Sequence, residues 1–242
     1  MKKRIGKIKN MFYKVFSIPI VRNSNIQKGK NVIIKNSLIR LVNSSTLIIE
    51  DGVIIENFDL FINNGFCIIG KNCILSSEYP LKSKIKIDKG KLEIKNNCVI
   101  KSNISCRFGG ECIINEYTIF NYGYLRCDEK IHIGKFVMIG SDTRIFDTDT
   151  HQKLISEVRR KRTVNDYPFI GREYNKPNTL PVMIGDDVWI GENVTLLKGC
   201  KIGNGAVIGT STTLSKLIVP ENATVVSQKP RIIIRGNNND KK

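Results

Sequence analysis

Aliphatic residues recur at every sixth position in the last third of the chain. They fall without a slip at Ile184, Ile190, Leu196, Ile202, Ile208 and Leu214. Glycine follows four of these residues, and the fifth position of each unit is usually small or branched. A period of six fits neither an α-helix nor a strand that simply alternates. It predicts a short strand and a tight turn, repeated, with the aliphatic side chain pointing into a narrow core.

The same unit appears upstream with more variation. Comparable units begin at Ile49, Ile69, Ile94, Ile114 and Ile133, about twenty residues apart. That distance is close to three units of six, or one turn of a triangular β-solenoid in which small loops absorb the excess. We therefore expect an all-β solenoid in which each coil contacts only its neighbours and the two ends need caps.

The rhythm stops between Ile145 and Ile184. The stretch IFDTDTHQKL, residues 145–154, carries His151, one of only two histidines in the chain. The whole interruption is long for a structureless connection, and such loops are commonly functional or disordered. Its basic side chains are Lys153, Arg159, Arg160, Lys161, Arg162, Arg172 and Lys176. The loop is either a solvated charged segment or a cover for an acceptor site that meets an acidic glycan or a phosphate.

Residues 1–19 predict a short basic amphipathic helix. Five apolar residues lie three or four positions apart between lysines, and Pro19 provides a natural stop. This helix could cap the first coil or bind anionic lipid, and the two roles are compatible. We expect three parts: a basic amphipathic segment at 1–25, a β-helix domain at 26–226 with an insertion at 151–183, and a C-terminal strand and polar tail at 227–242.

The charge balance points to an anionic partner. The chain has 242 residues with 39 Lys and Arg against 22 Asp and Glu, a net charge of +17. No acidic residue precedes Glu50, whereas eleven basic residues do. Such a balance suits a membrane surface, a nucleic acid or a phosphate-bearing ligand. We expect no nucleic acid, because residues 1–19 hold no recognised reading motif and solenoid coils offer no element that reads a groove.

The seven cysteines favour neither disulfides nor a zinc site. Their number is odd and no CxxC pair occurs. Most should be small apolar core residues in a reducing compartment. The apolar stretch near the N-terminus is short and interrupted by Lys14, so we expect no secretory signal and no membrane span. The sequence thus predicts a cytoplasmic protein, peripheral at the inner membrane face if residues 1–19 bind lipid and not if they only cap the first coil.

The hexads from about Asn115 to Val226 resemble those of the hexapeptide-repeat acyltransferases. The nearest likeness is to the sugar O-acetyltransferase branch, which includes maltose and galactoside acetyltransferases and capsule-modifying enzymes. This resemblance implies a left-handed parallel β-helix, a homotrimer with active sites between subunits, and acetyl-CoA as co-substrate. It implies no metal requirement.

The resemblance makes His151 the general base. In the resembled enzymes a histidine just after a coil, ahead of a long loop, takes the proton of a sugar hydroxyl as its oxygen attacks the acetyl-CoA thioester. Imidazole titrates in the right range for this task. A carboxylate would usually orient the ring, and Asp149, Asp147 and Glu173 are the candidates. The sequence does not choose among them.

Further contacts follow from the same resemblance. Asn121 and Asp128 match acceptor-binding positions, although both residue types are also ordinary in solenoid turns. The only tryptophan should face away from the core and pack against the CoA arm. The cofactor groove would comprise Trp189, Gly191, Gly209, Thr210, Ser215, Lys216 and Arg235. The C-terminal stretch SQKPRIIIR lacks the small GNPA segment of the resembled enzymes, which puts the local contacts there in doubt.

The sequence thus predicts an acetyl-CoA-dependent O-acetyltransferase that modifies a sugar hydroxyl of a cell-surface polysaccharide or its precursor. The alternative is an N-acyltransferase acting on an amino nucleotide-sugar, but the hexad pattern already occupies the N-terminal part where those enzymes often carry a nucleotide-binding domain. Serine acetyltransferase would need a helical N-terminal domain. A zinc carbonic anhydrase would need three histidines per metal, and we interpret His132 as structural. A purely structural scaffold would leave His151 and Trp189 unexplained.

Overall fold

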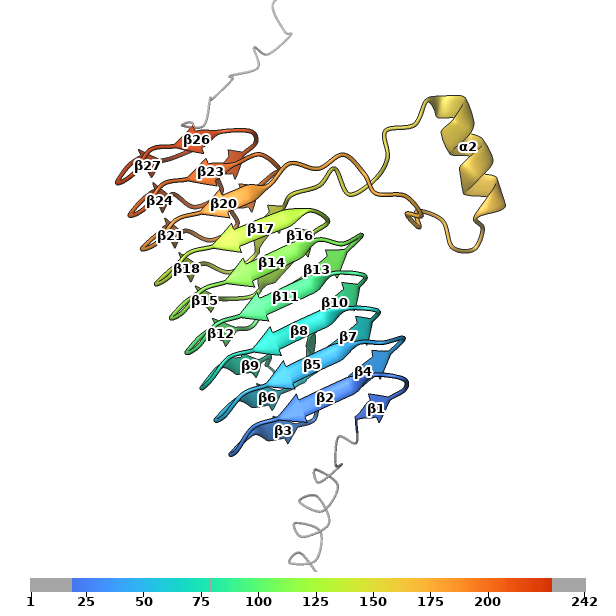
Figure 1. Cartoon of the computed structure of the whole chain (residues 1–242). Helices are drawn as coiled ribbons and strands as arrows, with labels where there is room; N and C mark the ends of the chain where they lie inside the picture. The colour runs from blue at the N-terminus through green and yellow to red at the C-terminus, as the bar shows by residue number, and fades with distance from the viewer. Residues whose placement is uncertain (1–18, 79, 228–242) are drawn as a thin grey trace, which may run out of the picture.

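The structure is a computed structural model that describes residues 19–78 and 80–227. The predicted N-terminal helix lies, except for Pro19, outside the described residues, as do Arg235 and nearly all of the predicted tail. Within the described part, the chain winds into a parallel β-solenoid (Figure 1). The fold class predicted from the hexads is therefore confirmed.

Three parallel sheets form the walls of the solenoid, and each contains nine strands. Sheet A comprises β1 (Ile20–Val21), β4 (Ile39–Val42), β7 (Phe58–Asn63), β10 (Ser83–Asp88), β13 (Asn103–Arg107), β16 (Gly123–Cys127), β19 (Thr143–Phe146), β22 (Thr195–Leu196) and β25 (Thr213–Leu214). Sheet B comprises β2 (Asn25–Lys28), β5 (Thr46–Ile49), β8 (Phe66–Ile69), β11 (Lys91–Ile94), β14 (Glu111–Ile114), β17 (Lys130–Ile133), β20 (Val182–Ile184), β23 (Lys201–Ile202) and β26 (Ile218–Val219). Sheet C comprises β3 (Ile33–Lys35), β6 (Ile54–Glu56), β9 (Ile74–Ser76), β12 (Val99–Ile100), β15 (Ile119–Phe120), β18 (Met138–Ile139), β21 (Trp189–Ile190), β24 (Val207–Ile208) and β27 (Thr224–Val225).

The core is built from columns of aliphatic side chains that the register stacks on one another. In sheet A, Ile39 pairs with Leu60, which pairs with Ile85, and the column continues through Ile104 and Leu125. All five are buried. Burying each such side chain contributes about 1.5–3 kcal/mol relative to exposure. The hexad position in the sequence thus becomes a vertical column in the solenoid.

The corner between sheets B and C requires a left-handed backbone once per coil. In the first four coils the residues there are Asn31 (φ 56°), Gly52 (φ 72°), Asn72 (φ 56°) and Asn97 (φ 60°), and glycine and asparagine tolerate this region with the least strain. Later coils place Tyr117 (φ 60°), Phe136 (φ 57°) and Asp187 (φ 57°) at the equivalent position, so the repeat imposes the backbone conformation there on other residue types as well.

The interruption after β19 leaves the solenoid and returns before β20, so it spans the corner between sheets A and B. It carries the helix α2 (Ser156–Asn165), none of whose residues is buried (Figure 1). Its side chains pair along its own surface, as Glu157 does with Lys161 at 3.0 Å. The sequence did not reveal this helix because it has no apolar stripe.

Two other predictions from the sequence concern the core and the membrane. The seven cysteines are all free and buried, which confirms their assignment as core residues. Among the described residues, no helix has both the length and the apolar character needed to cross a membrane.

Candidate active site

The two limbs of the insertion are tied together where they leave the solenoid. Thr148 and Thr179 form an antiparallel bridge. The N–H of Leu180 donates to the carbonyl of Asp147 at 2.9 Å, and the N–H of Asp149 donates to the carbonyl of Asn178 at 3.0 Å. The backbone ahead of His151 is therefore fixed by the rigid coil.

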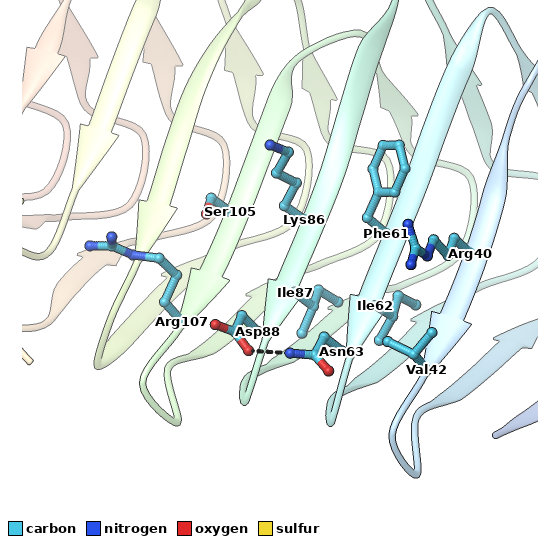
Figure 2. A pocket seen from close by; sticks show the side chains of 10 residues that line it. All are labelled: Arg40, Val42, Phe61, Ile62, Asn63, Lys86, Ile87, Asp88, Ser105 and Arg107. Carbon is cyan, nitrogen blue, oxygen red and sulfur yellow. Dashed lines mark hydrogen bonds between the residues drawn. The ribbon is translucent and has the colours of Figure 1, made fainter. Parts of the chain in front are cut away.

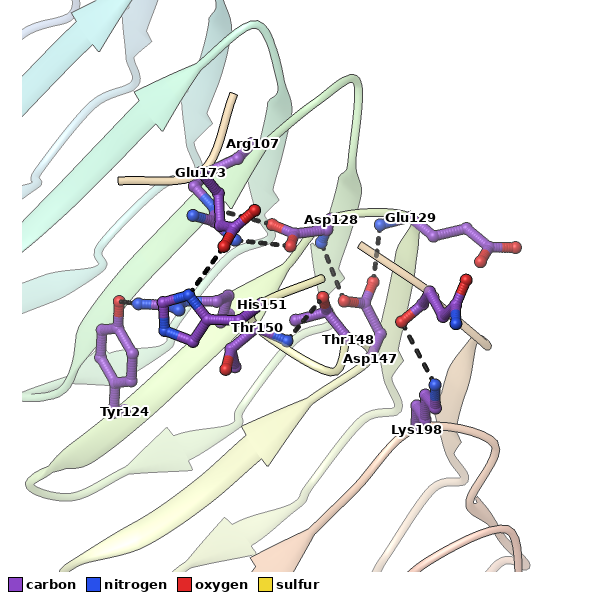
Figure 3. A network of polar contacts seen from close by, with 12 residues as sticks. Arg107, Tyr124, Asp128, Glu129, Asp147, Thr148, Thr150, His151, Glu173 and Lys198 are labelled. Carbon is purple, nitrogen blue, oxygen red and sulfur yellow. Dashed lines mark hydrogen bonds and ion pairs between the residues drawn. The ribbon is translucent and has the colours of Figure 1, made fainter. Parts of the chain in front are cut away.

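Asp147 serves the solenoid and does not contact His151. Its fully buried carboxylate accepts hydrogen bonds from the backbone N–H groups of Asp128 and Glu129, each at 2.8 Å (Figure 3). It also accepts the N–H of Lys130 at 2.8 Å. Burial raises the pKa of Asp147, while two of these N–H donors act in the opposite direction. The carboxylate stabilises the turn of the preceding coil, so it is not available to orient an imidazole.

Asp149 is directed toward the following coil. Its carboxylate forms ion pairs with Lys198 at 2.8 Å and with Lys153 at 3.3 Å. Lys198 is the main reason that the pKa of Asp149 is lowered, and Lys153 adds to the effect. Lys198 also donates to the carbonyl of Asn178 at 3.3 Å, so this ion pair secures both limbs of the insertion.

Glu173 is the carboxylate that lies against His151. Its Oε1 is 2.9 Å from His151 Nδ1 (Figure 3). Glu173 is almost wholly buried, with 5% of its side chain exposed, whereas 57% of the His151 side chain is exposed. The other carboxylate oxygen of Glu173, Oε2, lies 3.4 Å from Nη2 of Arg162 in α2. Of the three acids proposed from the sequence, the structure brings only Glu173 to the histidine.

This arrangement determines which imidazole nitrogen can act as a base. A carboxylate accepts a hydrogen bond, so Nδ1 carries the proton and donates to Glu173. The other nitrogen, Nε2, then holds the free lone pair. None of the described residues hydrogen-bonds to Nε2. The pair therefore presents an oriented, partly exposed base, with its partner buried behind it.

A cavity of about 260 Å³ adjoins this pair. His151, Arg159, Arg162, Ile170 and Glu173 are among the residues that line it. The sequence indicated Arg162 only as one of several loop cations. Its position against Glu173 could not be read from the sequence, because it depends on how α2 folds back over residues 172 and 173.

The two predicted acceptor-binding residues lie apart. Asp128 is fully buried, and its carboxylate is held by Arg107 through two hydrogen bonds of 2.9 and 2.7 Å. Contact of that carboxylate with an acceptor would require this pair to open. Asn121 is partly exposed and follows β15, at the corner between sheets C and A. His151 lies in the insertion, which leaves the solenoid at the corner between sheets A and B.

The predicted cofactor residues are likewise divided between two corners. Gly191, Gly209 and Thr210 follow strands of sheet C, and an added Cβ at Gly191 would lie 2.8 Å from the Thr210 nitrogen. Ser215 and Lys216 follow β25 of sheet A, at the corner from which the insertion leaves. Within a single chain, the residues that follow sheet C and those that follow β25 therefore lie at different corners of the solenoid.

Trp189 faces outward, as predicted, and is 56% exposed. It is not an isolated apolar side chain. In sheet C it pairs with Met138 on one side and Val207 on the other, and Met138 pairs with Ile119. We use the name apolar row for one outward residue from each strand of sheet C from β3 to β24, namely Ile33, Ile54, Ile74, Val99, Ile119, Met138, Trp189 and Val207. The sequence did not reveal this row, because its members are far apart in the chain.

His132 lies in β17 and is half-buried. Its Nε2 lies 3.1 Å from Asn115 Nδ2. Burial lowers the pKa of His132, and the positive charge of the nearby Lys130 lowers it further. These contacts agree with a structural role. Within residues 19–78 and 80–227, no three His, Cys, Asp or Glu side chains are grouped so that they could hold a metal ion.

The repeats match a known family. Residues 181–216 match the family described as bacterial transferase hexapeptide (six repeats). Residues 181–216 are thus similar to the hexapeptide repeats of that family. Over 133 residues the chain is 35% identical to the galactoside O-acetyltransferase of Lactococcus lactis subsp. lactis, and the match covers 54% of this chain and 56% of that relative. Over 210 residues it is 27% identical to the bifunctional protein GlmU of Aromatoleum aromaticum, covering 80% of this chain and 46% of that relative.

The chain spans about half the length of the curated relatives it matches. Among solved structures it resembles the polysialic acid O-acetyltransferase OatWY, with a TM-score of 0.56 and 22% identity. The likeness covers 92% of this chain and 93% of that one. At 22% sequence identity, this likeness shows only that the two chains share a fold, the left-handed parallel β-helix.

Proposed function

We propose that the protein is an acetyl-CoA-dependent O-acetyltransferase that modifies a sugar hydroxyl of a cell-surface polysaccharide or its precursor. The observation that carries the proposal is the 2.9 Å contact between His151 and the buried Glu173 at the base of the insertion. The similarity to a galactoside O-acetyltransferase supports the choice of a sugar hydroxyl and an acetyl group.

In this mechanism His151 acts as general base and then as general acid. Nε2 takes the acceptor proton as the hydroxyl oxygen bonds to the thioester carbonyl carbon, and the resulting imidazolium is stabilised by Glu173. When the carbon–sulfur bond breaks, Nε2 returns the proton to the departing sulfur. Transfer is direct, so no side chain becomes acetylated.

We further propose that the active protein is a homotrimer whose subunits meet through sheet C. The apolar row supports this, because exposed apolar stretches of such length mark interaction surfaces. Next to the row, Tyr117 and Phe136 stack with their ring centroids 5.0 Å apart, and each is 52% exposed. A neighbouring subunit would also supply the second corner, and so unite the two groups of predicted cofactor residues.

We propose that the protein acts in the cytoplasm, where acetyl-CoA and reduced thiols coexist. Contact with the inner membrane face through residues 1–19 would place it beside a lipid-linked glycan. Flotation with anionic liposomes, with and without residues 1–19, tests that part. Equal flotation of the two proteins would remove the membrane role.

The activity is tested by thiol release from acetyl-CoA with a panel of surface glycans. The described cysteines are all buried, so a thiol reagent reports the released CoA with little background. His151→Ala should lose at least about a hundredfold in turnover. Equal rates for wild type and His151→Ala would refute the mechanism. Faster turnover with amino nucleotide-sugars than with glycan hydroxyls would favour N-acyl transfer.

A further inference from the structure

The outward face of sheet A carries a row of cations that no predicted site includes. The register places Arg40, Phe61, Lys86, Ser105, Arg126 and Phe146 at equivalent outward positions on consecutive strands from β4 to β19. We call this the basic row. Its cations occupy every second strand, so they are about 10 Å apart along the solenoid axis. Phe61 lies between Arg40 and Lys86 (Figure 2).

The charges around the basic row are unbalanced. Outward positions on either side of it add the cations Lys84, Arg107 and Arg144. Of these six cations, only Arg107 forms an ion pair among the described residues, with Asp128. Of the acids of this face, Asp59 is 3.4 Å from Lys82, whereas Asp88 beside Lys86 accepts a hydrogen bond from Asn63 at 2.8 Å and forms no ion pair among the described residues. One unpaired acid thus stands against five unpaired cations.

The face is also hollowed. A groove of about 340 Å³ opens between β4 and β13, and its walls include Arg40, Phe61, Lys86 and Arg107 (Figure 2). Arg40 and Lys86 are both exposed, and the ring of Phe61 is partly exposed between them. Guanidinium and ammonium groups around an aromatic ring can hold carboxylates while a pyranose ring packs on the aromatic face.

The basic row runs toward the candidate base. Its last cation, Arg126, pairs in register with Phe146 of β19, the strand from which the insertion with His151 departs. Arg126 donates to the Tyr124 hydroxyl at 2.9 Å, and Tyr124 contacts Phe146 edge to face, 5.6 Å between centroids. Figure 3 shows Tyr124 on this wall beneath His151. A polymer lying along the row would therefore approach the base end-on.

We propose that sheet A binds an extended, carboxylate-bearing linear polysaccharide along the basic row, and that this polymer is the acceptor presented to His151. The periodic charge argues for a polymer over a small anion, because the cations span five strands with a regular spacing. This inference names the substrate class of the proposed function and rests on it. Polymer binding requires neither acetyl-CoA nor His151, so the binding proposal and the proposed acetyltransferase function can be refuted separately.

The test is equilibrium binding of the full-length protein to labelled polygalacturonate, without acetyl-CoA. Arg40→Gln/Lys86→Gln should weaken binding by about tenfold, or about 1.4 kcal/mol. The matched control is Lys71→Gln/Lys201→Gln, which removes two exposed cations near sheet B and the same net charge. That control should change affinity by less than about twofold, since exposed charges away from the polymer are screened.

Two more probes separate this proposal from general attraction of polyanions. Neutral dextran should not bind, and single-stranded DNA should bind more weakly than polygalacturonate. A charge-retaining pair, Arg40→Lys/Lys86→Arg, should keep affinity within about threefold if the folded face is intact. Equal losses in the glutamine pair and its control would overturn the proposal, as would tighter binding of DNA. Normal polygalacturonate binding by an inactive His151→Ala variant would leave it standing.

Discussion

Glu173→Gln tests how the buried carboxylate supports the candidate base. The substitution keeps the size and planar shape of the side chain, so a hydrogen bond to His151 Nδ1 can persist. It removes the negative charge that would stabilise the imidazolium formed during proton transfer. The amide can also offer its NH₂ group to Nδ1, which would place the ring proton on Nε2 and remove the base.

The magnitude follows from the contact distance. For unit charges on Glu173 and the imidazolium 2.9 Å apart, Coulomb's law gives about 1.4 kcal/mol at a dielectric constant of about 80. The interaction energy is about 2.9 kcal/mol at a dielectric constant of about 40. His151 is 57% exposed and Glu173 is 5% exposed, so the site lies between these conditions. We therefore expect turnover to fall by about tenfold to a hundredfold.

The assay is CoA release at saturating acetyl-CoA, comparing wild type, Glu173→Gln, His151→Ala and Glu173→Gln/His151→Ala. Because the carboxylate acts through the histidine, the double variant should be no slower than His151→Ala. Asp186→Asn is the matched control, since that exposed acid lies outside the insertion and accepts a hydrogen bond from the N–H of Lys135. Full activity of Glu173→Gln, or an additional loss in the double variant, would refute the reasoning.

Three other predictions concern assembly and stability. Met138→Arg places a charge within the apolar row, where Met138 is 53% exposed, and should reduce a trimer to monomers in light scattering. Asp147→Asn leaves buried N–H donors unpaired and should lower the free energy of unfolding in urea by about 2–4 kcal/mol. Lys198→Met should destabilise at neutral pH. Since Lys198 lowers the pKa of Asp149, the advantage of the wild type should be present above about pH 4 and vanish as pH falls through that lowered pKa.

Each of these predictions has a control on another part of the solenoid. Met183→Arg introduces the same charge on sheet B and should leave the mass unchanged. Asp186→Asn alters an exposed carboxylate that accepts one N–H, from Lys135, and should cost less than Asp147→Asn. Lys201→Met removes a lysine without an ion pair among the described residues, so its effect should not depend on the titration of Asp149. An unchanged mass for Met138→Arg would remove the support for a trimer through sheet C.

The repeat made the fold readable from the sequence. Most coils contribute the same few constraints: an aliphatic residue turned inward, a small or branched residue near it, and a corner residue with positive φ that is often glycine or asparagine. These constraints are local, so the hexads from Ile184 to Leu214 fix the solenoid, and the break after Ile145 marks where it opens. The position of His151 beside that break was likewise visible in the sequence.

The choice of Glu173 among three candidate acids depended on the tertiary structure. Asp147 and Asp149 are nearer in sequence, but Asp147 is directed toward backbone N–H groups of the preceding coil and Asp149 toward Lys198. Glu173 reaches the ring because the insertion doubles back after α2. Sequence distance does not record such a return.

The two outer faces show the same division. The sequence by itself determined the period, the core and the location of the break, because these follow from neighbouring residues. The apolar row of sheet C and the basic row of sheet A gather residues about twenty or more positions apart, with one from each coil. Only the register between coils brings them side by side, and register is a property of strand pairing in the folded chain.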